Sequence, residues 1–169
     1  MADASAGPVE VDGPERIFQD PLFDKMVGVW DINGVIAGRQ IRQLCDVEWV
    51  LNHQFLKLHF VGVESGQLPG SRQRANYEAL VFFGYDNMSE RYVAHWLDIY
   101  GGRFSEALGY GQKVSENSIR FVFEYDGPLH NTVTWDEESK RWKMVIRQKN
   151  QRGEWTQFAD EVFKRRVGE

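Results

Sequence analysis

The chain has 169 residues, with 25 acidic and 20 basic side chains, which gives a net charge of −5 at neutral pH. That negative field repels phosphate backbones, so we do not expect nucleic acid as a partner. No stretch reaches the ~20 consecutive apolar residues of a membrane helix, and residues 1–7 lack the basic start and apolar run of a secretory signal. The single cysteine, Cys45, suits a reducing compartment. We therefore expect a cytoplasmic protein that does not associate with membranes.

The N-terminal part predicts a tail followed by a short helix. Residues 1–13 are small and acidic with Pro8, and we expect a flexible tail there and a single domain over 14–169. Asp20-Pro21 is typical of a helix start, because Asp caps and Pro tolerates the first helical position. The pattern predicts an amphipathic helix over about 14–26, lying across one end of a sheet, either as a plug or packed on the outside.

Beyond residue 27 the sequence alternates between apolar and polar residues, and turn-forming residues interrupt it at short intervals. The expected strands are 27–36, 40–51, 54–63, 77–83, 91–99, 104–114, 118–125, 129–135, 141–149 and 155–165. The longest connection, 65–74, is a candidate lid at a cavity mouth. A long run of neighbouring antiparallel strands tends to close, because closure removes exposed edges. We predict an all-β fold, an antiparallel up-and-down barrel of about 8–10 strands; a two-sheet sandwich is the alternative.

The central hairpin is the most strongly patterned stretch, with its turn at Asp86-Asn87-Met88-Ser89. On its second strand, one face carries Val93, His95, Leu97 and Ile99. The other face carries Tyr92, Ala94, Trp96 and Asp98. Both faces are largely apolar, so the pattern does not decide which one points inward.

Several motifs resemble known families. Gly28-Val29-Trp30, at the start of the first strand, is similar to the Gly-x-Trp that opens calycin barrels. A second set is similar to a bacterial family of lipocalin-like proteins of unassigned function, over roughly residues 22–125. It consists of Gly84-Tyr85-Asp86, Arg91-Tyr92-Val93, Trp96-Leu97-Asp98, Ser105 and Gly109, with Trp49-Val50-Leu51 and Phe55-Leu56 in the second hairpin. Asn52-His53-Gln54 departs from the glycines and arginine expected there. The resemblance implies a calycin-like barrel with a central cavity, and it brings no catalytic residues.

The candidate ligand-binding residues are large or polar side chains that would line the cavity if they point inward. They are Trp49, Tyr77, His95, Phe121, Tyr125, Trp142 and Met144. A pocket that is apolar with a few orienting polar groups is typical of small-molecule sites. His95 is the first catalytic candidate if the protein is an enzyme. His53, His59 and His130 are expected in a turn, on the outer surface and near a rim, and no spacing predicts a metal site.

We therefore expect reversible binding of a small hydrophobic or aromatic molecule in a central cavity, without a cofactor. Haem is not expected, because the last third of the chain offers only His130. One alternative is a barrel-type isomerase or cyclase that uses a cavity His or Tyr as general acid or base. A second alternative is a homodimeric interaction protein with an apolar outer face carrying Trp96 or Trp155.

Overall fold

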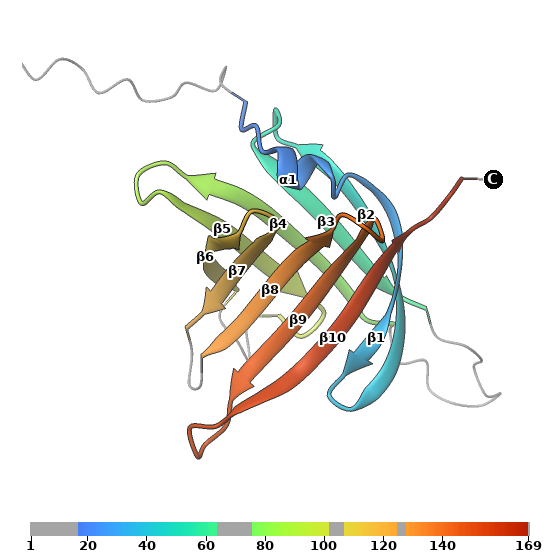
Figure 1. The fold of residues 1–169 in the computed structure, drawn as a ribbon, viewed down its shortest axis with the longest axis vertical. Coiled ribbons are helices and arrows are strands. Elements are labelled where there is room, and N and C mark those ends of the chain that lie inside the picture. The colour runs from blue at the N-terminus through green and yellow to red at the C-terminus, as the bar shows by residue number, and fades with distance from the viewer. Residues whose placement is uncertain (1–16, 64–75, 102–106, 125–127, 169) are drawn as a thin grey trace, which may run out of the picture.

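The computed structural model describes residues 17–63, 76–101, 107–124 and 128–168. Ten antiparallel strands form a closed barrel in which each strand pairs with its neighbours in sequence and β1 pairs with β10 (Figure 1). The strands are β1 Gly28–Ile36, β2 Arg39–Val50, β3 Phe55–Gly62, β4 Glu78–Asp86, β5 Arg91–Asp98, β6 Leu108–Ser115, β7 Ser118–Phe123, β8 Leu129–Asp136, β9 Arg141–Lys149 and β10 Trp155–Arg165. The predicted all-β up-and-down barrel is confirmed, and closure excludes the sandwich.

The N-terminal helix is shorter than predicted. The only helix among the described residues, α1, spans Pro21–Asp24. Its start is as expected, because the Asp20 carboxylate accepts hydrogen bonds from the backbone N–H groups of Leu22 and Phe23 at 2.9 and 3.2 Å. Upstream, the Phe18 N–H donates to the carbonyl of His53 instead of continuing a helix.

Helix α1 lies across one end of the barrel, which we call the closed end (Figure 1). Phe23 is fully buried and packs against the rings of Phe83 and Tyr92, with centroid distances of 5.6 and 5.4 Å. Two indoles fix the following turn: Trp30 Nε1 donates to the Met26 carbonyl at 2.7 Å, and Trp142 Nε1 donates to the Lys25 carbonyl at 3.3 Å. Of the two placements considered, the structure therefore shows the plug.

The Gly28-Val29-Trp30 motif has a physical explanation at this end of the barrel. The Arg165 guanidinium lies 4.3 Å from the Trp30 ring centroid and donates to the carbonyls of Val27 and Lys25 at 2.7 and 3.1 Å. A Cβ atom at Gly28 would collide with the Arg165 guanidinium, and the φ of +134° at Gly28 is one that other residues rarely adopt. The start of β1 and the end of β10 are thus joined through a glycine, an indole and an arginine.

The turn between β2 and β3 is built without glycine. Leu51, Asn52 and His53 all have positive φ, at 52°, 55° and 61°, which costs roughly 1–2 kcal/mol per non-glycine residue. His53 is held there by stacking on Trp49 at 3.9 Å and by donating from Nδ1 to the Phe18 carbonyl at 2.7 Å. The departure from the expected glycines is therefore accommodated by contacts of His53 with its neighbours.

Aromatic rings from strands that are not neighbours in the sheet meet inside the barrel. Phe83 of β4 stacks on Phe121 of β7 at 4.7 Å, and Phe60 of β3 meets Phe163 of β10 at 6.1 Å. All four side chains are at most 2% exposed. Such rings each bury a large apolar area and supply much of the stability of the fold.

Some predictions concern residues outside the described part of the chain. They are the tail over 1–13, the candidate lid over 65–74, the resemblance residue Ser105 and the candidate ligand residue Tyr125. Within the described ranges, no helix has the length and apolarity to cross a bilayer.

Candidate functional site

Polar side chains face the interior between the middle of the barrel and the end remote from α1. Gln43 of β2, Asn131 of β8 and Glu161 of β10 are buried there among apolar neighbours. Tyr77, just before β4, and Trp96 of β5 also face inward, and Trp96 Nε1 donates to the Tyr77 hydroxyl at 3.3 Å. We refer to these five residues as the interior polar residues.

Glu161 is the most unusual of the interior polar residues. The residue is 3% exposed, and no described residue forms a hydrogen bond with its Oε1 atom or a salt bridge with its carboxylate. Burial disfavours the carboxylate and raises the pKa of Glu161 from 4.5 to about 7, and the neighbouring charge of Asp160 adds to this effect. Near neutral pH this carboxyl is therefore poised between its acid and base forms.

The inward orientation of Glu161 follows from the register of β10. Ala159 and Phe163 face inward with it, whereas Asp160 faces outward and forms an ion pair with Lys143 at 3.6 Å. A shift of one residue would turn every side chain of the strand to the other face, burying Asp160 and exposing Phe163. The hydrophobic neighbours thus hold Glu161 in an apolar interior, where an unpaired carboxyl is costly.

Asn131 is the second interior group with an unused acceptor. It is 2% exposed, and none of the residues that the structure describes bonds to its Oδ1 atom. In the sheet it pairs with Phe121 on β7 and Ile146 on β9, while Glu161 pairs with Met144 on β9 and Gly34 on β1. One strand, β9, therefore separates the two groups.

The other ionisable groups of the interior are held in their neutral forms. Burial raises the pKa of the Tyr77 hydroxyl well above its usual range, and it does the same for the Cys45 thiol, with the Glu161 charge acting in the same direction on both. A fully buried thiol of this kind is inert as a nucleophile. Glu161 is thus the interior group whose proton is exchangeable near pH 7.

The structure places five of the seven predicted ligand-binding residues on the inner face but does not bring them together. Trp49 and Trp142 lie near α1, where Trp49 Nε1 donates to Asp24 Oδ1 at 2.9 Å. Phe121 and Met144 are buried beside Asn131 and Glu161 respectively, as their register shows. Tyr77 belongs to the interior polar residues.

The prediction that His95 points inward is wrong. His95 is exposed on the outer face of β5, where its ring meets Phe55 edge-on at 6.0 Å. The larger ring of Trp96 takes the inner position and stacks on Phe60 at 5.8 Å. The alternation was ambiguous because the outer face is also apolar, with Leu97 52% exposed beside His95.

The remaining histidines lie outside the interior. His59 of β3 bonds to Glu78 at 2.7 Å on the outer face, and His130 of β8 packs against Trp155 at 4.4 Å. Of the two tryptophans expected on an outer interaction face, Trp96 points inward instead, and Trp155 is the one on the outside. Over the described residues, no group of three or more His, Cys, Asp or Glu side chains is arranged to hold a metal ion.

Sequence reasoning missed Glu161 and Asn131, although the signal was present. In β10, Glu161 occupies the same alternate positions as Ala159 and Phe163, and in β8, Asn131 occupies those of Val133 and Trp135. A polar residue in an otherwise apolar inward register marks a buried polar group. The register shift at Gln157 and Ala159 obscured this pattern in β10, because it breaks the alternation in the first half of the strand.

No protein-family model matches the sequence, and no curated protein matches it at a significant level.

Proposed function

We propose that the chain binds a small, mainly apolar or aromatic molecule inside the barrel, with a hydrogen-bond donor on that molecule directed at Glu161. The observation that carries this proposal is the unsatisfied Oε1 atom of Glu161 on a side chain that is 3% exposed. Buried polar groups without a partner are rare and call for an explanation, of which an absent ligand is one. The unpaired Oδ1 atom of Asn131 offers a second acceptor to the same ligand or to a bound water.

The chemistry of these two groups selects the ligand class. Both offer acceptor atoms in an apolar setting, so they favour amine, hydroxyl or amide N–H groups. An amine is the best match for Glu161, because its positive charge would stabilise the carboxylate that burial destabilises. A carboxylic acid is disfavoured, since two like charges would meet in a medium of low dielectric. The neighbouring Met144 and Phe121 supply apolar contacts for the body of the ligand.

Two further parts of the proposal rest on the sequence motifs. We infer that the chain is related to calycins, through the bacterial lipocalin-like proteins that residues 22–125 resemble. The closed barrel and the packing of Arg165 on Trp30 next to Gly28 support this inference. We infer a cytoplasmic location from the single, buried cysteine.

Calorimetry and thermal shift with four naphthalene probes of similar shape test the proposed ligand class. The probes are naphthylmethylamine, naphthylmethanol, methylnaphthalene and naphthoic acid. We expect the amine to bind best and the alcohol next, with weak binding of the hydrocarbon and none of the acid. Glu161→Leu removes the acceptor and should weaken amine binding by about 10- to 100-fold, while leaving the hydrocarbon unaffected or better bound. Equal affinities of the four probes, or amine binding that is unchanged in Glu161→Leu, would refute the proposal.

A second function is favoured by the pKa of about 7 at Glu161. A carboxyl poised near the working pH is suited to act as general base or acid in an isomerase or cyclase. This role replaces the one expected of His95, which is exposed on the outer face. If a substrate is found, Glu161→Gln should abolish turnover while retaining binding of a neutral donor such as naphthylmethanol. Turnover that persists in Glu161→Gln would exclude this role.

A further inference from the structure

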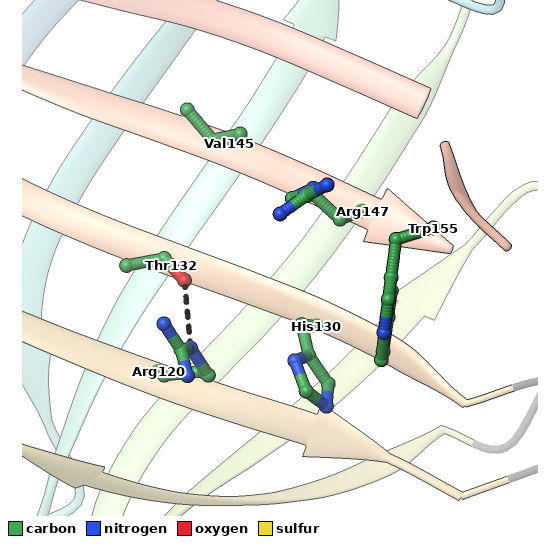
Figure 2. A pocket seen from close by; sticks show the side chains of 6 residues that line it. All are labelled: Arg120, His130, Thr132, Val145, Arg147 and Trp155. Atoms are coloured by element: carbon green, nitrogen blue, oxygen red, sulfur yellow. Dashed lines mark hydrogen bonds between the residues drawn. The ribbon is translucent and has the colours of Figure 1, made fainter. Parts of the chain in front are cut away.

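A cavity with a volume of about 240 Å³ is hollowed into the outer wall of the barrel, over β7, β8, β9 and the start of β10 (Figure 2). It is lined by Arg120, His130, Thr132, Val145, Arg147 and Trp155. These residues point outward, so the cavity is separate from the interior polar residues. Two arginines and an imidazole in one cavity form a cationic site on a chain whose net charge is −5.

The two arginines lie on either side of β8. Arg120 of β7 pairs with Thr132, and Arg147 of β9 pairs with His130, so the guanidinium groups flank these two residues from opposite sides (Figure 2). Arg120 donates from Nε to Thr132 Oγ1 at 3.4 Å, which directs its side chain across the cavity. Long side chains spaced by two strands, roughly 10 Å at the backbone, can converge on one small ligand.

No salt bridge joins Arg120 or Arg147 to any acidic side chain among the described residues. Two described acidic side chains act near the cavity: Asp160, which pairs in register with Val145, forms an ion pair with Lys143, and Glu124 lies close enough to affect His130. Burial, followed by the charge of Arg120, lowers the pKa of His130; the charge of Glu124 opposes this, and the charge of Arg147 adds a lowering effect smaller than that of Glu124. The cavity therefore presents two positive charges that form no ion pair with the acidic side chains of the described residues.

Trp155 closes one end of the cavity as an apolar wall. Its ring packs against His130 at 4.4 Å with a tilt of 43°, and Lys149 Nζ lies 5.7 Å from its centroid (Figure 2). A half-buried tryptophan beside two arginines offers contact area for the organic part of an anion. The volume of 240 Å³ is below the roughly 300–1,000 Å³ of drug-sized sites, so the site suits a small anion with at most one ring.

We propose that this cavity binds the phosphate group of a small phosphate monoester, with the phosphate between Arg120 and Arg147 and the organic part against Trp155. Guanidinium groups match phosphate oxygens with paired N–H donors. The two positive charges also match a phosphate dianion better than they match a carboxylate, which carries only one negative charge. The Thr132 hydroxyl and a protonated His130 supply further donors. A polyanion such as nucleic acid is disfavoured by the net charge of the chain.

Calorimetry with phenyl phosphate, inorganic phosphate and benzoate tests this proposal on the whole protein. We expect phenyl phosphate to bind most tightly, inorganic phosphate more weakly and benzoate weakest. Arg120→Gln and Arg147→Gln should each weaken phenyl phosphate binding by about 10- to 100-fold. Trp155→Ala should lower the affinity for phenyl phosphate to that for inorganic phosphate without changing the latter. The matched control is Arg141→Gln, on the same strand and outer face as Arg147 but outside the cavity, which should bind as the wild type does.

A second readout follows the His130 ring by NMR. A bound phosphate dianion should raise the pKa of His130 towards and above its usual range, and this rise should disappear in Arg147→Gln. Binding that survives both Arg120→Gln and Arg147→Gln, or that falls equally in Arg141→Gln, would overturn the proposal. So would tighter binding of benzoate than of phenyl phosphate. Glu161→Leu should leave phenyl phosphate binding unchanged, so that this proposal and the one for the barrel interior fail separately.

Discussion

The pH dependence of stability should carry the signature of Glu161. Its pKa is raised from 4.5 to about 7 in the folded protein, and each pKa unit corresponds to about 1.4 kcal/mol. Below about pH 4.5 the group is protonated in both the folded and unfolded states, so its titration does not lower the free energy of unfolding. As pH rises from 4.5 to 7 the unfolded chain loses this proton while the folded chain retains it, so the free energy of unfolding falls. The total loss from this group is about 3 kcal/mol.

Glu161→Gln isolates this effect, because glutamine does not titrate. We expect the free energy of unfolding in urea to be similar for the two proteins near pH 4.5. By about pH 8 the variant should be more stable than the wild type by about 3 kcal/mol. All other titrating groups are common to both proteins, so their contributions cancel in the difference.

Glu137→Gln provides a control of opposite sign. Hydrogen bonds from Lys140, Trp135 and Lys25 lower the pKa of Glu137 to about 2, so its stabilising effect is present above pH 4.5 and is lost as pH falls towards 2. The variant should therefore lose stability relative to the wild type at neutral pH and not in acid. If the stability difference between Glu161→Gln and the wild type stays constant from pH 4.5 to 8, Glu161 is not a buried titrating carboxyl.

Further substitutions test the closed end, the pairing of β1 with β10, and the outer face. Asp20→Ala removes the acceptor for the first turn of α1 and for the Tyr92 hydroxyl, which donates to Asp20 at 2.6 Å. Urea unfolding should show that the free energy of unfolding falls by about 1–2 kcal/mol. An unchanged unfolding midpoint would contradict the capping role. Gly34→Ala should destabilise by about 1–3 kcal/mol or more, because the added Cβ would collide with the backbone carbonyl of Asp160 on β10 and lie 2.7 Å from the Cα of Glu161. Gly38→Ala, with open space but a φ of +76°, should lose only about 1 kcal/mol. His95→Ala should change neither naphthylmethylamine affinity nor stability by more than about 0.5 kcal/mol, and a large loss of affinity would restore His95 as a site residue.

The barrel was predictable because strand alternation is a local property. The turn at Asp86 is an example: its carboxylate accepts from the Met88 N–H at 2.9 Å, within four residues of chain. The helix start at Asp20 was predictable for the same reason. The lack of helix over the described residues 17–20 was not, because the Phe18 N–H donates to the carbonyl of His53, which lies 35 residues further along the chain.

The site was harder to predict, because its parts meet only across the barrel. The orientation of the central hairpin depends on two contacts of Trp96, which stacks on Phe60 and donates a hydrogen bond to the Tyr77 hydroxyl. Neither residue is next to Trp96 in the sequence. The outer cavity joins Arg120 and Arg147 from strands separated by β8, and the register of these strands is set by three-dimensional pairing. A charged residue in an apolar register, as at Glu161, is the one feature of the site that a sequence shows directly.

Methionine methyl NMR provides the most direct test of a ligand site beside Glu161. The chain has 4 methionines, of which Met144 pairs with Glu161, Met26 is buried at the closed end and Met88 is 92% exposed. Titration with naphthylmethylamine should shift the Met144 methyl resonance and give contacts from it to the naphthyl ring, while Met26 and Met88 stay in place. Saturation with naphthylmethylamine that leaves Met144 unmoved, or that shifts only Met88, would contradict binding inside the barrel.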